Sequence, residues 1–344
     1  RVRRLYPPRD DAQPLYVQEQ GAVLGKSGEN LKVTKGKELL LEAHLIDVSQ
    51  VVLCGAVQAT APAMHLCLSR DIPIVHLSMG HWFYGVSAGL GLRNAFDRAA
   101  QFKRAQDPAF CLELAKAFVW AKGQNQRTLL RRNGEGVPSL ALDEMATTLK
   151  HIETAKDLQE LLGLEGLLAR HYFMNFPSMI RPRESMDFTF DMSGRNRRPP
   201  KDPVNACLSF VYALLVKECT VALLANGLEP HWGFFHQPRH GRPALSLDLM
   251  EEFRPVVADS AVLSAINTGM VGRGSFETNG VAWSLNANGR KAIIKAFELR
   301  MDQLITHPVF EYRISWRRAL QLQAQLLVRV LRGELPSYQG MVTR

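Results

Sequence analysis

The residues best suited to chemistry lie in residues 231–255, which read HWGFFHQPRHGRPALSLDLMEEFRP. The second half of this stretch predicts a short amphipathic helix that the last proline stops. Glu251 and Glu252 follow Asp248 by three and four positions on it, so their carboxylates share a face with that of Asp248 and repel it. His236 precedes them in a loop rich in Gly, Pro and Arg. Two carboxylates and an imidazole that converge here would suit a hard divalent metal ion.

The ordinary alternative is that the three carboxylates form a solvated helix face. Apolar residues around most of the helix argue against it, namely Leu245, Leu247, Leu249, Met250 and Phe253. At least one carboxylate is therefore expected to be partly buried and to need a partner, because an unpaired buried charge is costly. A cation from the same region would also serve as that partner, such as Arg239, Arg242 or Arg254.

Glu165 is a second candidate, because it is the only charged residue between Glu160 and Arg170 in the segment LQELLGLEGLLARHYF. A carboxylate in so apolar a helix is either functional or held in a buried ion pair, for instance with Arg170 or Arg254. Asn205 stands at an expected helix start, where Asn is usually an N-cap.

The elements that position these residues change in type along the chain. Short β-runs separated by Gly, Asn, Ser or Pro fill residues 14–92, with one short helix in ATAPAMHLCLSRD. Helices are then expected over residues 96–132, 140–173, 204–226 and 289–332. We predict an α+β protein in which a small N-terminal β-rich domain (14–92) precedes a larger all-α domain (93–338) that carries the candidate site. Residues 1–13 are predicted to be a linker and residues 339–344 a tail.

The balance of charge favours a polyanionic partner, since 42 Lys and Arg outnumber 33 Asp and Glu. Eight of the basic residues lie between Arg98 and Arg132, including Lys122. A single basic helix is usually just a soluble face, but several clusters in one domain favour contacts to DNA phosphates. The residues expected to make such contacts are Arg98, Lys103, Arg104, Arg181, Arg183, Arg197 and Arg198.

The five cysteines show no CxxC spacing, which favours reduced thiols and a cytoplasmic protein. The apolar segment 207–228 is long enough to span a bilayer but carries Lys217 and Glu218 at its middle, so we expect a buried helix and no membrane partner. The chain begins with Arg1 rather than Met, so we expect the natural polypeptide to be longer.

Several long segments together resemble the CRISPR adaptation integrase, the catalytic subunit that inserts new spacers into a CRISPR array. The resemblance covers residues 14–338 and lies in VVLCGAVQATAPAMHLCLSRDIPIVHLSMGHWFYG, LLGLEGLLARHYF, RRPPKDPVNACLSFVYALL, GFFHQPRHGRPALSLDLMEEFRP and THPVFEYRISWRRALQLQAQLLVRVLRGELPSY. The leader RVRRLYPPRDDAQPLYVQEQGA also resembles the junction in forms fused behind a reverse transcriptase.

This resemblance implies catalytic metal ligands at Glu165, His236 and Glu251, with Asp248 as an adjacent acid that could also ligate. Asn205 and Arg242 are expected near the site, and His240 is a second histidine that could compete with His236. The family's reaction is the attack of a DNA 3′-hydroxyl on a repeat phosphodiester with Mg²⁺ or Mn²⁺. Its partners are double-stranded DNA and a small ferredoxin-fold subunit that bridges two homodimers.

Two other functions fit the same residues. A metal-dependent endonuclease acting on branched DNA would use water in place of the 3′-hydroxyl. A non-catalytic DNA-binding scaffold would use the acids only as partners for Arg239, Arg242 and Arg254.

Overall fold

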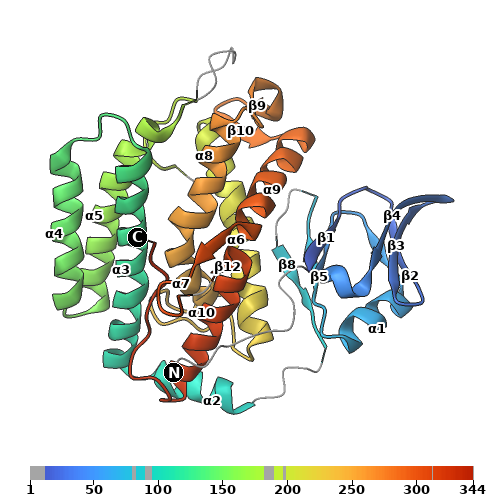
Figure 1. The fold of residues 1–344 in the computed structure, drawn as a ribbon, viewed down its shortest axis with the longest axis horizontal. Helices are drawn as coiled ribbons and strands as arrows, with labels where there is room; N and C mark the ends of the chain where they lie inside the picture. Colours follow the sequence, from blue (N-terminus) through green and yellow to red (C-terminus); the bar gives the residue numbers. More distant parts are fainter. Residues whose placement is uncertain are drawn as a thin grey trace. The chain divides into compact units, whose positions relative to one another are not determined.

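The computed structural model describes residues 12–79, 83–89, 95–181, 190–196, 199–311 and 313–343. The chain divides into two compact units. One ends at Ala95 and also includes Leu224–Gly227, and the other contains Phe96–Leu223 and the residues from Leu228 onward. The protein is α+β, because strands dominate the first unit and helices the second (Figure 1).

The N-terminal unit contains two four-stranded sheets. The first has the order β1-β5-β7-β8, in which β7 and β8 alone pair antiparallel, and is built from β1 (Gln13–Val17), β5 (Val48–Cys54), β7 (Ile74–Leu77) and β8 (Phe83–Ser87). The second has the order β4-β3-β2-β6 and is built from β2 (Val23–Ser27), β3 (Asn30–Lys35), β4 (Glu38–His44) and β6 (Gln58–Ala59). A 3₁₀ turn, η1 (Leu45–Asp47), joins β4 to β5, and helix α1 (Ala61–Ser69) joins β6 to β7.

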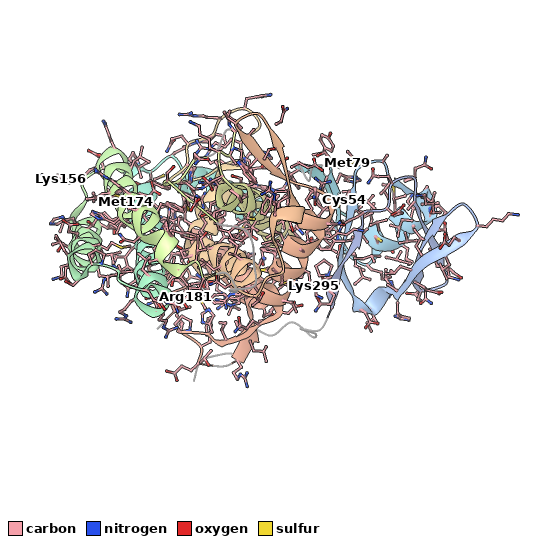
Figure 2. The ribbon with its side chains drawn as sticks, turned by 90° about the horizontal axis from the view of Figure 1, so that it is seen from above. Cys54, Met79, Lys156, Met174, Arg181 and Lys295 are labelled. Carbon is pink, nitrogen blue, oxygen red and sulfur yellow. The ribbon has the colours of Figure 1, made fainter. Side chains whose placement is uncertain are left out.

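The local sequence explains these elements. Thr60 caps α1, because its hydroxyl accepts a hydrogen bond from the backbone N–H of Ala63. Alternate residues of β3 enter the core, among them Leu31 and Val33. All five cysteines of the chain lie among the described residues, are buried and form no disulfide; Cys54, at the end of β5, is labelled in Figure 2.

The second unit is built mainly from helices (Figure 1). They are α2 (Ala95–Arg104), α3 (Pro108–Asn133), α4 (Ser139–Thr154), α5 (Leu158–Asn175), α6 (Pro203–Ala225), α7 (Ala244–Phe253), α8 (Ser260–Asn267), α9 (Ala287–Asp302) and α10 (Trp316–Leu331). Shorter elements are η2 (Phe176–Met179), η3 (Arg254–Asp259), η4 (Arg273–Ser275), and the hairpins β9 (Phe276–Asn279) with β10 (Ala282–Leu285) and β11 (Leu304–Thr306) with β12 (Arg313–Ser315).

Three of the four predicted long helices are interrupted in the structure. The first predicted helix is interrupted at Asp107, which is the N-cap of α3, whose first residue is Pro108. The second is interrupted at Asp157, which is the N-cap of α5. The β11–β12 hairpin divides the last one. The predictions were wrong at these points because apolar periodicity continues through each break, while a cap or a Pro redirects the backbone.

The prediction that the helix of residues 244–255 stops at its proline was also wrong. The chain passes from α7 into the π-helical segment η3 and then into α8 without leaving helical geometry. Pro255 lies in the first turn of η3, where the wider π turn accommodates its missing N–H.

Helix α6 is the buried helix that the sequence predicts. Among the described residues, it is the one helix that is long and apolar enough to cross a membrane, and 67% of its most apolar window is buried inside the protein. Lys217 at its middle is fully buried, and its Nζ pairs with Glu218 Oε1 at 2.6 Å. Arg317 of α10 also pairs with Glu218, at 3.7 Å.

The C-terminal residues treated as a tail pack against the helical unit. Met341 is 1% exposed, and its N–H donates to Glu252 Oε2 at 2.5 Å. Asn125 of α3 donates to the carbonyl of Met341 and accepts from the N–H of Thr343. These contacts anchor the C-terminal residues to α3 and α7.

Candidate metal centre

Close packing of α3 against α5 brings the side chains of Lys122 and Glu165 together. Gly123 permits this approach, because a Cβ there would lie 2.6 Å from Leu168 Cδ1 of α5 and 2.9 Å from Leu149 Cδ2 of α4. The neighbouring Lys122 is buried, and its Nζ donates a hydrogen bond to Glu165 Oε1 of α5. The partner of Glu165 is therefore Lys122, and the expected pairs with Arg170 or Arg254 are not formed among the described residues.

The loop before α7 is organised by Asp248, whose side chain is fully buried. Its Oδ2 accepts the backbone N–H groups of Phe234 and Phe235, at 2.7 and 3.0 Å. Its Oδ1 accepts the N–H of His236 at 2.8 Å and lies 2.7 Å from His236 Nδ1. Gly233 gives the loop room, since a Cβ there would lie 2.8 Å from Asp248 Oδ2.

These hydrogen bonds determine which ring nitrogen of His236 is available to a ligand. With Nδ1–H donating to Asp248, the lone pair of Nε2 is free to bind a Lewis acid. Nε2 lies 3.8 Å from Glu251 Oε1. Asp248 is thus already engaged by four donors and orients His236, whereas the sequence left it as a second possible ligand.

Glu251 contacts two cations in this cluster. Its Oε2 lies 2.6 Å from Lys122 Nζ, and its Oε1 lies 3.1 Å from Nη2 of Arg254. Burial by itself would raise the pKa of the Glu251 carboxyl, but Arg254 and Lys122 outweigh burial and hold that pKa well below its usual value. Glu251 is therefore ionised although it is 2% exposed.

The solvated-face alternative is wrong for all three carboxylates of α7. Asp248, Glu251 and Glu252 are each 2% exposed or less. Glu252 points away from the cluster and accepts hydrogen bonds from Tyr338 Oη at 2.6 Å and from the N–H of Met341. Burial raises the pKa of Glu252 to about 7, although these donors oppose the shift. Glu252 therefore has a structural role.

The donor set fits a divalent metal in its chemistry. Glu165, Glu251 and Nε2 of His236 supply two carboxylates and one imidazole, and the Lys122 ammonium already stands between the two carboxylates as a cation. As the side chains stand, the described residues contain no group of three or more His, Cys, Asp or Glu that could hold a metal ion. A metal would take the place of the lysine ammonium.

A second network extends from this cluster to Gly194, Arg195 and Asp202. Arg254 and Arg195 both lie over the ring of Tyr212, at 5.1 and 5.3 Å. Tyr212 Oη donates to Asp259 Oδ1 at 2.7 Å, and Tyr172 Oη donates to Oδ2 of the same carboxylate at 2.8 Å. The two tyrosines and two arginines thus tie η3 to α5 and α6.

Asn205 belongs to this second network and is not an N-cap. Its Oδ1 accepts from Nη1 of Arg195 at 2.7 Å, and its Nδ2 donates to the carbonyl of Gly194 at 2.9 Å. The capping carboxylate is that of Asp202, which accepts the N–H of Asn205 at 2.7 Å. The pattern PKDPVNA contains both residues, and the Asp precedes the proline that starts the helix.

The other residues expected near the centre differ in placement. His240 is exposed, so His236 is the histidine that the structure brings to Glu251. Arg242 is half-buried; burial lowers its pKa, the nearby Arg239 adds to this, and Asp248 and Glu251 oppose it. Arg242 therefore lies within electrostatic reach of the cluster but makes no ion pair with its acids.

Four of the seven residues expected to contact phosphates are described. Lys103 is exposed and Arg98 is half-buried, whereas Arg104 lies over the ring of Phe110 at 5.0 Å. Arg181, labelled in Figure 2, pairs with Glu135 at 3.0 Å and is half exposed. The other three, Arg183, Arg197 and Arg198, lie outside the described residues.

The most informative residue that the sequence did not single out is Lys122. It was one of eight basic residues in a predicted helix, and nothing in its neighbours marks it as buried. The signal that could have found it is Gly123, since a glycine inside a helix points to a close approach by another element.

Comparison with known proteins identifies the family. The family model described as CRISPR associated protein Cas1 matches residues 15–299. A Cas4 exonuclease/Cas1 endonuclease fusion from Geobacter sulfurreducens is 47% identical over 99% of this chain, and a similar fusion from Rhodospirillum rubrum is 44% identical. The chain spans 62% and 58% of the length of these two fusions. A CRISPR-associated endonuclease Cas1 from Thermus thermophilus is 39% identical, and the match covers 96% of this chain and 97% of that protein.

Solved structures show the same fold. A casposase bound to its integration product superposes with a TM-score of 0.80 and 23% identity, covering 95% of this chain and 92% of that one. A Cas1 protein from Thermotoga maritima superposes with a TM-score of 0.79 and 21% identity, covering 96% of this chain and 100% of that one.

The reverse-transcriptase junction that the leader resembles receives no support. The two fusions above join Cas1 to Cas4, and a Cas6–reverse transcriptase–Cas1 protein in complex with Cas2 is only 23% identical. With a family model matched over most of its length and relatives at 39–47% identity, this chain belongs to the Cas1 family of CRISPR-associated proteins.

Proposed function

We propose that this chain is a metal-dependent DNA integrase that inserts spacer DNA into a CRISPR array. The observation that carries the proposal is the convergence of Glu165, Glu251 and Nε2 of His236 around one cationic position. The names of the relatives support nuclease chemistry, and the fold neighbour bound to an integration product supports strand transfer. In the reaction, a DNA 3′-hydroxyl attacks the phosphorus of a repeat phosphodiester, a new phosphodiester bond forms, and the bond to the repeat strand's 3′-oxygen breaks. That oxygen leaves as a 3′-hydroxyl, so the proton lost by the attacking hydroxyl is balanced by the one that it gains.

The three converging residues would hold the metal, Mg²⁺ or Mn²⁺, which would polarise the phosphoryl oxygen and favour ionisation of the attacking hydroxyl. Asp248 keeps Nε2 of His236 directed toward Glu251 by accepting hydrogen bonds from Nδ1–H and from three backbone N–H groups. Arg254 keeps Glu251 ionised and ready to ligate. Asp248 is therefore proposed to be a positioning residue rather than a ligand.

The proposed partners are double-stranded DNA and a small adaptation subunit. The basic side chains on α2 and around Arg181 would contact phosphates, which would hold both DNAs without reading their sequence. A neighbour of the same fold is in complex with Cas2, and this supports a Cas2-type partner. The proposed role of that partner is to bridge two dimers of this chain.

An exposed apolar edge strand supports the homodimer. Strand β4 forms one edge of its sheet, and Leu39, Leu40 and Leu41 along it are 38–50% exposed. Unpaired backbone and apolar side chains at a sheet edge favour pairing with another chain. Replacing Leu39 and Leu41 by Glu should yield a monomer, as measured by light scattering after size-exclusion chromatography.

The decisive assay joins a labelled short duplex to a supercoiled plasmid that carries a CRISPR array, in the presence of a Cas2 subunit and Mg²⁺ or Mn²⁺. Wild type should transfer label to the plasmid, and His236→Ala should not. His240→Ala is the matched control, because this second histidine of the same loop is exposed and should leave transfer intact. Transfer by His236→Ala at the wild-type rate would contradict the proposed site.

The endonuclease is the second candidate, and the names of the relatives favour it. It predicts metal-dependent nicking of branched DNA without joining when a 3′-hydroxyl donor is supplied. The scaffold alternative is met in part, since Glu251 pairs with Arg254 at 3.1 Å. It has less support at Asp248, which pairs with His236 rather than with Arg239 or Arg242. A scaffold would bind DNA equally well in EDTA and after Glu165→Ala, and would neither join nor nick.

A further inference from the structure

Lys122 occupies an unusual position for a lysine. It lies in the middle of α3, its side chain is 5% exposed, and Gly123 beside it lets α4 and α5 pack close to the helix. A lysine buried to this degree requires compensation by negative charge, because removing an ammonium from water is costly.

That compensation comes from two of the three proposed metal ligands. Lys122 Nζ donates to Glu165 Oε1 and lies 2.6 Å from Glu251 Oε2. Arg254 pairs with the other oxygen of Glu251 at 3.1 Å. Two carboxylates thus face two cations, and these four side chains carry no net charge.

This balance of charge is lost when a divalent ion binds to the carboxylates. The ion would add two positive charges to these four balanced side chains, and it would need the carboxylate oxygens that Nζ now contacts. The flexible four-carbon stem of lysine allows Nζ to leave without movement of the helix.

We propose that Lys122 is the internal counter-ion of the metal-free centre, which a metal must displace, so that Lys122 weakens metal binding and keeps the two carboxylates together until metal arrives. This inference rests on the proposed metal-dependent function. Lys122 acts through Glu165 and Glu251 and is a positioning residue.

The test measures metal binding directly. Mn²⁺ is titrated into wild type, Lys122→Met and Lys116→Met, and free Mn²⁺ is followed by electron paramagnetic resonance. Lys116→Met is the matched control, because it removes one positive charge from the same helix at a position whose Nζ pairs with Glu113. Lys122→Met should bind Mn²⁺ about tenfold more tightly or better than wild type, since no ammonium competes for the carboxylates. Lys116→Met should bind as wild type does.

Thermal unfolding supplies a second readout that does not depend on activity. In EDTA, Lys122→Met should unfold several degrees below wild type, because Glu165 and Glu251 repel one another without the ammonium. Mn²⁺ should raise its midpoint by more than it raises those of wild type and Lys116→Met. If Lys122→Met does not fold in EDTA, Lys122→Gln, which keeps a donor without the charge, gives the same comparison.

The outcomes separate this inference from the proposed function. Wild-type Mn²⁺ binding that Glu251→Gln abolishes would support the metal site itself. If the site exists but Lys122→Met and Lys122→Gln bind Mn²⁺ no more tightly than wild type, the counter-ion is refuted and the site stands. If wild type and Glu251→Gln bind Mn²⁺ equally, the metal site is refuted and the counter-ion with it.

Discussion

Asp259 should make the folded protein less stable as pH rises, and replacing it by Asn should remove that dependence. Its carboxylate is fully buried in η3 between the hydroxyl groups of Tyr172 and Tyr212. Burial raises the pKa of Asp259 from 3.8 to about 6, although both tyrosines and the arginines 195 and 254 oppose the shift.

The sign follows from proton linkage. A carboxyl whose folded pKa lies above its unfolded pKa binds its proton more tightly in the folded state. Its contribution to stability is therefore complete below the unfolded pKa near 3.8 and is lost as pH rises through the folded pKa of about 6. The shift corresponds to a total of about 3 kcal/mol, and about half of that change falls between pH 5 and pH 8.

The assay is urea unfolding of wild type, Asp259→Asn and Asp143→Asn at pH 5 and pH 8. Asp143 is exposed on α4 and controls for the loss of one carboxylate. Between the two pH values, wild type should lose about 1 kcal/mol more stability than Asp259→Asn, while Asp143→Asn should follow wild type. Equal losses in wild type and Asp259→Asn would refute the assignment of this pH dependence to the buried carboxyl.

Three further changes test the loop and the C-terminal anchor. Asp248→Asn should destabilise the protein by about 3 kcal/mol in urea unfolding, because four donors lose a charged acceptor, and it should weaken Mn²⁺ binding by about tenfold or more. Gly233→Ala places a Cβ 2.7 Å from the carbonyl oxygen of His236, so strand transfer should fall sharply while DNA binding in a gel-shift assay persists within a few-fold. Glu252→Ala leaves the Tyr338 hydroxyl and the N–H of Met341 without their acceptor, so the C-terminal residues should become sensitive to limited proteolysis. Retained resistance would show that other contacts suffice.

The sequence predicts the identities of the converging residues better than it predicts their contacts. Glu165 and Glu251 stand out because a charge within an apolar helical pattern demands a partner, and that reasoning holds for both. Which partner each acquires depends on how α3 packs against α5 and α7, and this packing cannot be inferred from a single helix pattern. The lysine at 122 was therefore missed.

The roles of Asp248 and Glu252, the acids next to the proposed ligand Glu251, could not be predicted from the sequence either. Asp248 and Glu252 are acids on the same helix as the proposed ligand Glu251, yet one binds the backbone of the His236 loop and the other binds the C-terminal residues. Several of these partners are backbone N–H groups, which every residue except proline carries, so no sequence pattern marks them. Strand positions in residues 14–92 were easier to predict, because alternation and turn residues are local signals.

The π-helical segment η3 has a consequence for insertions and deletions. A π turn has the effect of one extra residue inserted into an α-helix, and here it separates the α7 face that carries Glu251 from the segment that carries Asp259. Deleting one residue within η3 would restore regular α geometry and leave everything after the deletion in nearly the same orientation relative to α7, because the wider π turn has absorbed that residue. Deleting a second residue would rotate everything after it by about 100°. The carboxylate at 259 could then no longer meet Tyr172 and Tyr212 while Glu251 still faces Lys122. In this segment the π turn therefore gives the chain a tolerance of one residue in length, and single-residue deletions at 255–258 should be tolerated better than deletions of two residues.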